Sequence, residues 1–225
     1  MSFELIAGPV FYSDAMNHFG GEGNCLGMSG QWAMTVIGSE AKNLAEPNVI
    51  EAKGLQTHYR HSLAHSNVSG AEVFFLEREA EKRSLGHIKR KTAIGNGAAV
   101  DLVNSLPKKS GNVVIVTCWD FSSEEHMKVK QGCLGRFRTP DSWAGHAVAL
   151  FKSKKSGAIV FYDPNFGRYL WKPTAGMSLK SDIKRYLIDT YADVAGTRMT
   201  SAIMFSRDDH VLADTVPLDF TTVKY

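Results

Sequence analysis

The feature that most constrains the fold is a change in the spacing of apolar residues near residue 112. From there the run Val113-Val114-Ile115-Val116-Thr117-Cys118-Trp119 is continuous and rich in β-branched side chains, which is typical of a strand covered on both faces. Before this run the apolar residues recur at helical spacing, and after it short apolar runs alternate with turns. The sequence therefore predicts an α+β fold, with helices first and a mainly antiparallel sheet later.

The predicted elements follow from this periodicity. Helices are expected over Cys25 to Ile37, ended by Gly38, and over roughly 40–65, 70–84, 98–106 and 178–191. Strands are expected over about 112–119, 145–151, 157–163, 166–171 and 199–207. No repeat or Pro/Ser-rich linker marks a boundary, so we expect a single domain over 1–225, with a helical part over about 1–110 and a sheet part over about 111–210.

Composition limits the class of protein. A chain of 225 residues that is 44% hydrophobic can bury a substantial core. The net charge of +3 is too small to indicate nucleic-acid binding. No stretch approaches the roughly 18 apolar residues that cross a bilayer, and no early segment has the pattern of an ordinary signal peptide. Basic clusters at 82–91 and 152–155 are typical of solvated faces, and the sequence offers no support for association with a membrane surface.

The three cysteines, Cys25, Cys118 and Cys133, are odd in number and widely spaced. This suits neither a disulfide framework nor a four-cysteine zinc site, so free thiols are expected. No metal, nucleotide or flavin is implied.

Two weaker patterns have ordinary explanations. His58, His61 and His65 would share one helical face, but three surface histidines are commoner than a metal site. The Gly95-Asn96-Gly97 run precedes a helix and follows no expected strand, so it lacks the context of a dinucleotide-binding motif.

Cys25 is the candidate nucleophile. It opens the first predicted helix, where the N–H dipoles of a helix N-terminus favour a thiolate. A cysteine beside an apolar helical stripe is, by itself, more often a small buried hydrophobe. Gly20, Gly21 and Gly23 would let the backbone approach a ligand closely, although a flexible loop explains them equally.

His146 and Asp163 are the candidate base and its orienting carboxylate. A polar turn over 152–157, with Phe151 opposite Ala158, would place His146 directly opposite Asp163 on one face of a hairpin. A slip of one residue would separate them onto opposite faces. A purely structural His–Asp pair is the alternative.

Three blocks of sequence carry a family resemblance. The blocks are Gly23-Asn24-Cys25-Leu26-Gly27-Met28-Ser29-Gly30-Gln31-Trp32, Gly145-His146-Ala147-Val148-Ala149-Leu150 and Phe161-Tyr162-Asp163-Pro164-Asn165-Phe166-Gly167. Together they resemble the YopT-type cysteine protease effectors, papain-like enzymes that bacteria deliver into host cells. The Asp-Pro-Asn-Phe-Gly run is the most specific element, and the order Cys, His, Asp agrees.

The resemblance implies a papain-like fold and a catalytic triad. Cys25 would attack a carbonyl carbon, His146 would accept the thiol proton and later protonate the leaving group, and Asp163 would orient His146. The oxyanion hole would use the Cys25 N–H and an upstream polar side chain. The nearest upstream candidates are Asn17 and His18, of which we take Asn17.

By the same resemblance the chain would be a secreted thiol protease and virulence effector without an ordinary signal peptide. It would hydrolyse a peptide bond of a host protein in the target-cell cytosol, with no cofactor. The same triad also suits a glutamine deamidase, an acyltransferase or a peptidoglycan amidase, and a non-enzymatic binding module is a further alternative. Family members often carry an N-terminal extension for targeting or self-processing, whereas 24 residues precede Cys25 here, so self-processing and lipid targeting are not carried over from the resemblance.

Overall fold

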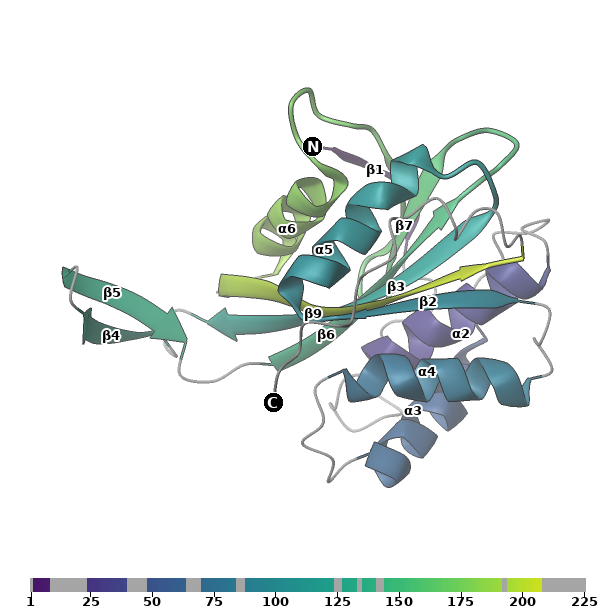
Figure 1. Cartoon of the computed structure of the whole chain (residues 1–225), viewed down its shortest axis with the longest axis horizontal. Helices are drawn as coiled ribbons and strands as arrows, with labels where there is room; N and C mark the ends of the chain where they lie inside the picture. The colour runs from purple at the N-terminus through teal and green to yellow at the C-terminus, as the bar shows by residue number, and fades with distance from the viewer. Residues whose placement is uncertain are drawn as a thin grey trace, which may run out of the picture.

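A seven-stranded antiparallel sheet forms the centre of the molecule, with helices on both of its faces (Figure 1). The computed structural model describes residues 2–8, 24–39, 48–63, 70–83, 88–123, 127–132, 135–140, 144–191 and 194–207. Most of the helices precede most of the strands, and every pairing in the sheet is antiparallel. The predicted α+β fold is therefore confirmed.

The strands follow the sheet order β1-β8-β7-β6-β3-β9-β2. Their bounds are β1 Phe3–Ala7, β8 Gly167–Trp171, β7 Ile159–Asp163, β6 Ala144–Lys152, β3 Val113–Ser123, β9 Val194–Ser206 and β2 Lys89–Ile94. A separate two-stranded ribbon consists of β4 Met127–Gly132 and β5 Gly135–Pro140. The sequence patterns predict neither this ribbon nor the two edge strands β1 and β2, because edge strands have no continuous apolar run.

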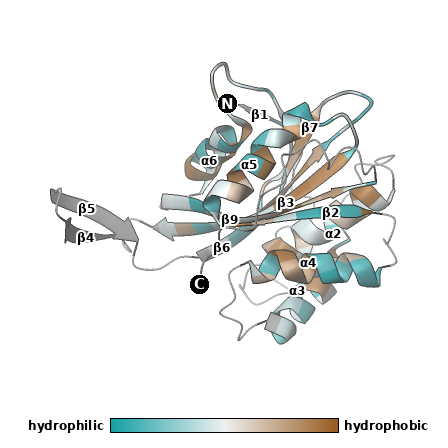
Figure 2. Cartoon of the chain, viewed as in Figure 1, coloured by the Kyte–Doolittle hydropathy of each residue, from teal (hydrophilic) through white to brown (hydrophobic). Residues whose placement is uncertain are grey.

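The helices form two layers (Figure 1). One layer contains α2 Cys25–Gly38, α3 Val49–Leu63 and α4 Ala71–Lys82, and the other contains α5 Asn96–Ser105 and α6 Leu179–Thr190. A 3-10 turn, η1 Leu106–Lys108, follows α5. Figure 2 shows hydrophobic strands between these layers and hydrophilic residues on the outer helix faces. None of the helices in the described ranges is both long enough and apolar enough to span a membrane.

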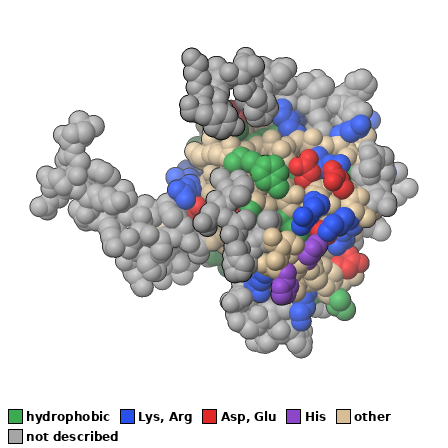
Figure 3. All heavy atoms as spheres, turned by 60° about the horizontal axis from the view of Figure 1, so that its bottom comes forward, with side chains coloured by type: hydrophobic (Ala, Val, Ile, Leu, Met, Phe, Trp, Pro, Cys, Tyr) green, Lys and Arg blue, Asp and Glu red, His purple; other side chains and the backbone are tan. Residues whose placement is uncertain are grey.

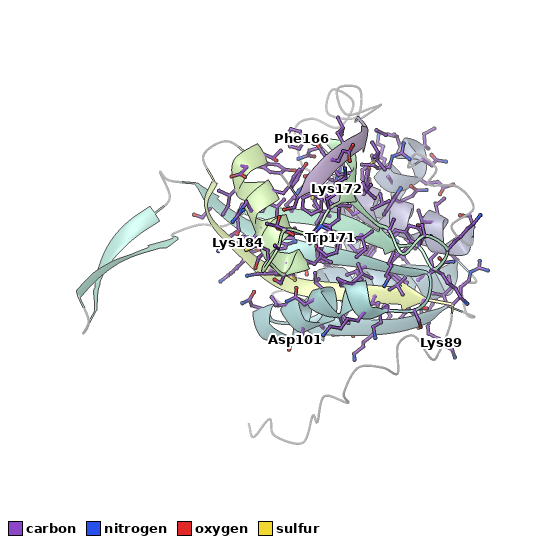
Figure 4. All side chains as sticks on the ribbon, turned by 90° about the horizontal axis from the view of Figure 1, so that it is seen from above. Lys89, Asp101, Phe166, Trp171, Lys172 and Lys184 are labelled. Atoms are coloured by element: carbon purple, nitrogen blue, oxygen red, sulfur yellow. The ribbon has the colours of Figure 1, made fainter. Side chains whose placement is uncertain are left out.

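Alternate residues of the central strand β3 point to opposite faces of the sheet and so belong to two different hydrophobic cores. Val114, Val116 and Cys118 belong to the core beneath α2, α3 and α4, whereas Val113 and Ile115 belong to the core beneath α5 and α6. This two-sided burial explains the continuous apolar run. Beside the core beneath α5 and α6, Trp171 Nε1 donates a hydrogen bond to Asp182 of α6 at 2.9 Å. Figure 4 shows Trp171 next to that helix.

One expectation about Gly95-Asn96-Gly97 is wrong. A strand, β2, does precede this run, which opens α5. However, β9 lies between β2 and β3, the strands that α5 connects, and pairs antiparallel with both. The two adjacent parallel strands of a dinucleotide-binding βαβ unit are therefore lacking here.

Two glycines let α2 pack closely against its neighbours. A Cβ atom at Gly27 would lie 2.3 Å from the carbonyl oxygen of Ala52 on α3, and one at Gly30 would lie 2.5 Å from Leu76 of α4. On the opposite side, Ser29 Oγ donates to the carbonyl oxygen of Ala147 on β6 at 2.9 Å. These contacts fix the first turn of α2 against the strand that carries His146.

Candidate active site

Cys25 is the first residue of α2, and its side chain is half-buried. Its thiol lies close enough to the His146 side chain and to the backbone N–H groups of Leu26 and Ala147 for each of them to lower its pKa. The structure thus places Cys25 at the helix N-terminus predicted from sequence, in contact with the predicted histidine. Two backbone donors and an imidazole surround its sulfur.

The hairpin register differs from the predicted one by two residues. Phe151 pairs with Val160 rather than Ala158, and Leu150 pairs with Phe161. The predicted directly opposed pair is therefore wrong. Because side chains alternate with a period of two, a two-residue shift keeps His146 and Asp163 on the same face as diagonal neighbours. His146 Nε2 lies 3.4 Å from Asp163 Oδ1, and the two side chains are 5% and 0% exposed.

A tyrosine that the sequence patterns do not identify joins these two residues. Tyr191, just after α6, has its Oη atom 2.8 Å from His146 Nε2 and 2.9 and 3.0 Å from the Asp163 carboxylate oxygens. The phenol donates to the carboxylate and accepts from Nε2–H. Its ring lies against His146, Phe121 and Phe166, with centroids 5.0, 5.2 and 5.2 Å apart. Since Nε2 is engaged in this way, Nδ1 is the nitrogen left for Cys25.

The Asp-Pro-Asn-Phe-Gly turn holds the carboxylate in place. Asp163 Oδ1 accepts the backbone N–H of Asn165 at 2.9 Å, and the Asn165 side-chain amide donates to Tyr191 Oη at 2.8 Å. Gly167 closes the turn at φ 112°, and a Cβ atom there would lie 2.2 Å from the Ala7 carbonyl oxygen. The most specific of the three sequence blocks therefore positions the orienting carboxylate and its tyrosine.

The local electrostatics favour a charged pair. Burial alone would raise the pKa of the Cys25 thiol, but the hydrogen bond from His146 and its positive charge outweigh burial, and the pKa is lowered. Burial alone would lower the pKa of His146, but the hydrogen bonds and charges of Asp163 and Cys25 raise it above its ordinary value. Both shifts favour the thiolate–imidazolium form of the pair over the neutral form.

The pKa of a second cysteine nearby, Cys118, is shifted in the opposite direction. Cys118 is buried on β3 and lines the same cavity as Cys25. Burial raises the pKa of Cys118, and the negative charge of Glu72 raises it further. Cys118 is therefore a neutral thiol, whereas Cys25 is activated.

A cavity of about 200 Å³ adjoins the pair. Its described lining consists of Cys25, Leu26, Gln56, Tyr59, Glu72, Cys118, Trp119, Asp120, Gly145, His146, Ala147 and Thr200. Gln56 is 6% exposed, and its Oε1 accepts the Gly27 N–H at 2.8 Å. Because that N–H is a donor, the amide oxygen must face it, and the Nε2 donors are directed elsewhere. Gln56 thus brings a fixed amide to the cavity beside the thiol.

The structure does not describe several of the residues considered in the sequence. Asn17, His18, His65 and Cys133 lie outside the described residues, as do the three glycines expected before Cys25. On the face shown in Figure 3, basic, acidic and histidine side chains are mixed. His58 Nδ1 lies 3.1 Å from Glu79 Oε1. Within the part of the chain that the structure describes, no group of three His, Cys, Asp or Glu side chains could hold a metal ion.

Comparison with known proteins adds little to this geometry. No family model and no curated protein matches the chain. The crystal structure of the Pseudomonas avirulence protein AvrPphB is similar, with a TM-score of 0.46 and 15% sequence identity over 88% of this chain and 96% of that chain. The function proposed below therefore rests on the site itself.

The charged pair predicts the pH dependence of thiol alkylation. Cys25 should react with iodoacetamide at lower pH than an ordinary thiol, and lose reactivity only as the pH falls through its lowered pKa. In His146→Ala the imidazolium is lost while burial remains, so reactivity should move to alkaline pH. Peptide mapping by mass spectrometry gives the rate at each cysteine, with Cys118 as the internal control. Equal labelling of Cys25 and Cys118 only at alkaline pH would contradict the charged pair.

The hydrogen bonds of Tyr191 lead to a second prediction, about the rate of Cys25 alkylation. Tyr191→Phe keeps the ring but removes every hydrogen bond of Oη, so His146 should be held less firmly and Cys25 alkylation at neutral pH should slow by about tenfold. Thermal unfolding should show a loss of about 1 kcal/mol. The matched control is Tyr169→Phe, whose hydroxyl donates to the Phe166 carbonyl oxygen at 3.2 Å. Unchanged alkylation in Tyr191→Phe would remove the tyrosine from the site.

Proposed function

We propose that the chain is a papain-like cysteine hydrolase of the YopT type, with Cys25, His146 and Asp163 as its catalytic triad. The observation that carries this proposal is that Cys25 and His146 line the same cavity, with the thiol pKa lowered by the imidazole and the imidazole pKa raised. A thiolate beside an imidazolium supplies the nucleophile and the general acid that acyl transfer needs.

The reaction would proceed in two stages. The Cys25 thiolate attacks the carbonyl carbon, and His146 donates its proton to the leaving amine nitrogen as the C–N bond breaks. This leaves a thioester on Cys25 and a neutral imidazole. Water then attacks the thioester while His146 accepts its proton, which releases a carboxylic acid and restores the thiolate–imidazolium pair. Asp163 and Tyr191 hold the imidazole in one orientation throughout.

We also propose Gln56 as a side-chain donor of the oxyanion hole. Such donors must be fixed before the reaction and directed at the oxygen on which charge develops. The Gly27 N–H in the first turn of α2 fixes the Gln56 amide, and the side chain lines the cavity beside Cys25. The Cys25 backbone N–H would be the second donor. Gln56 lies downstream of the nucleophile, whereas the sequence expectation considered only residues upstream, such as Asn17.

For the substrate we propose a protein of a host cell, cut at a peptide bond by a bacterial effector in the target-cell cytosol. This part of the proposal is supported by the resemblance of the three sequence blocks. The whole chain would act as one catalytic domain. The two-stage reaction is complete with protein groups and water alone.

The test is a search for new protein N-termini in a host-cell lysate. The wild-type protein should generate N-termini that are absent with Cys25→Ala and His146→Ala and still present with Cys118→Ala, because only the first two changes remove the charged pair. Mass spectrometry identifies the sites. A gain of one mass unit at glutamine without chain cleavage would indicate deamidation instead, and no Cys25-dependent product would contradict the proposal.

Gln56→Glu tests the donor at the identified cleavage site. The glutamate keeps an acceptor for the Gly27 N–H but has no amide donor, so cleavage should slow by about 100-fold. Iodoacetamide alkylation of Cys25, which needs no oxyanion hole, measures any change in the thiolate itself. A cleavage rate that falls only as much as the alkylation rate would exclude Gln56 as the donor.

A further inference from the structure

The cavity beside Cys25 carries a negative charge that no cationic side chain of its described walls pairs with. Glu72 of α4 lines the cavity, and its Oε2 atom is buried without a hydrogen-bond partner among the described residues. The Tyr59 hydroxyl lies near the Glu72 carboxylate, whose negative charge adds to the effect of burial in raising the pKa of Tyr59. A hydroxyl supplies one donor but no positive charge, so the carboxylate is incompletely satisfied.

The second carboxylate of the cavity, that of Asp120, is paired with a cationic side chain. Asp120 Oδ2 accepts two hydrogen bonds from Arg198, from Nε at 2.9 Å and from Nη2 at 2.8 Å. This two-point pairing balances the charge of Asp120. No lysine or arginine is among the described residues that line the cavity. Glu72 is therefore the unbalanced charge.

The field of Glu72 extends over its neighbours in the cavity. Burial raises the pKa of both Tyr59 and Cys118, and in each case the negative charge of Glu72 raises it further. Both groups consequently stay neutral and add no compensating charge. An uncompensated carboxylate in a partly enclosed, low-dielectric cavity attracts a cation much more strongly than one in open water.

We propose that this cavity binds a cationic side chain, lysine or arginine, of the substrate polypeptide, next to the bond that Cys25 attacks. The volume of about 200 Å³ accommodates such a side chain. Its aliphatic stem would lie along Leu26 and Trp119, which form apolar parts of the wall. Gly145, an exposed residue of the lining, has open space where a Cβ would be, so none of the described side chains occupies that position. This inference rests on the proposed function of Cys25 as a nucleophile.

The experiment compares two thiol reagents of similar size and opposite charge. Aminoethyl methanethiosulfonate is a cation and sulfonatoethyl methanethiosulfonate is an anion, and each forms a mixed disulfide with the Cys25 thiolate while releasing methanesulfinate. Peptide mapping separates reaction at Cys25 from reaction at Cys118. The ratio of the cation rate to the anion rate should be higher at Cys25 than for N-acetylcysteine amide. In Glu72→Gln this ratio should fall by about fivefold, as expected for the loss of one nearby charge.

The control is Glu77→Gln, which makes the same chemical change on the same helix at a residue that does not line the cavity. The ratio should stay at the wild-type value in this variant. An equal fall in both variants, or an unchanged ratio in Glu72→Gln, would overturn the cationic site while leaving the Cys25 nucleophile intact. A wild-type ratio equal to that of N-acetylcysteine amide would do the same. If Cys25 reacts with neither reagent, the proposed function fails and this inference with it.

Discussion

The electrostatic interaction between Cys25 and His146 is the one on which the rest of the site depends. It joins the first residue of a helix to a central strand, so the approach of the two side chains is set by how α2 packs on the sheet. Gly27 and Gly30 allow α3 and α4 to approach α2 closely, and Ser29 ties α2 to β6. Since the same helix contacts bring Gln56 and Glu72 to the cavity, the packing that fixes the nucleophile also shapes its surroundings.

Much of this arrangement follows from sequence alone. The change in the spacing of apolar residues near residue 112 predicts the α+β order, because a strand buried on both faces needs apolar residues at every position. The periodicity after Cys25 predicts α2 almost to its last residue. The faces of His146 and Asp163 are also predicted correctly, although their register is not. That success depends on the error being an even number of residues.

The rest of the site could not be predicted from local patterns. The register error arises because the turn between β6 and β7 includes Ser153 and Ala158, with a backbone hydrogen bond between them. Tyr191 follows α6, far from either partner in sequence, and reaches them only through the fold. Gln56 and Glu72 are ordinary polar residues of helical patterns. Their roles follow from helix packing, which sequence periodicity does not specify.

The most direct test of the central claim is the protonation state of His146, measured by NMR of imidazole nitrogens in histidine-labelled protein. The account predicts that His146 is protonated at neutral pH, because Asp163 and the Cys25 thiolate raise its pKa. It also predicts that Cys25→Ala lowers the titration midpoint, because the thiolate charge is removed. A neutral imidazole in the wild-type protein, or a midpoint that does not change when Cys25 is replaced, would contradict the charged pair.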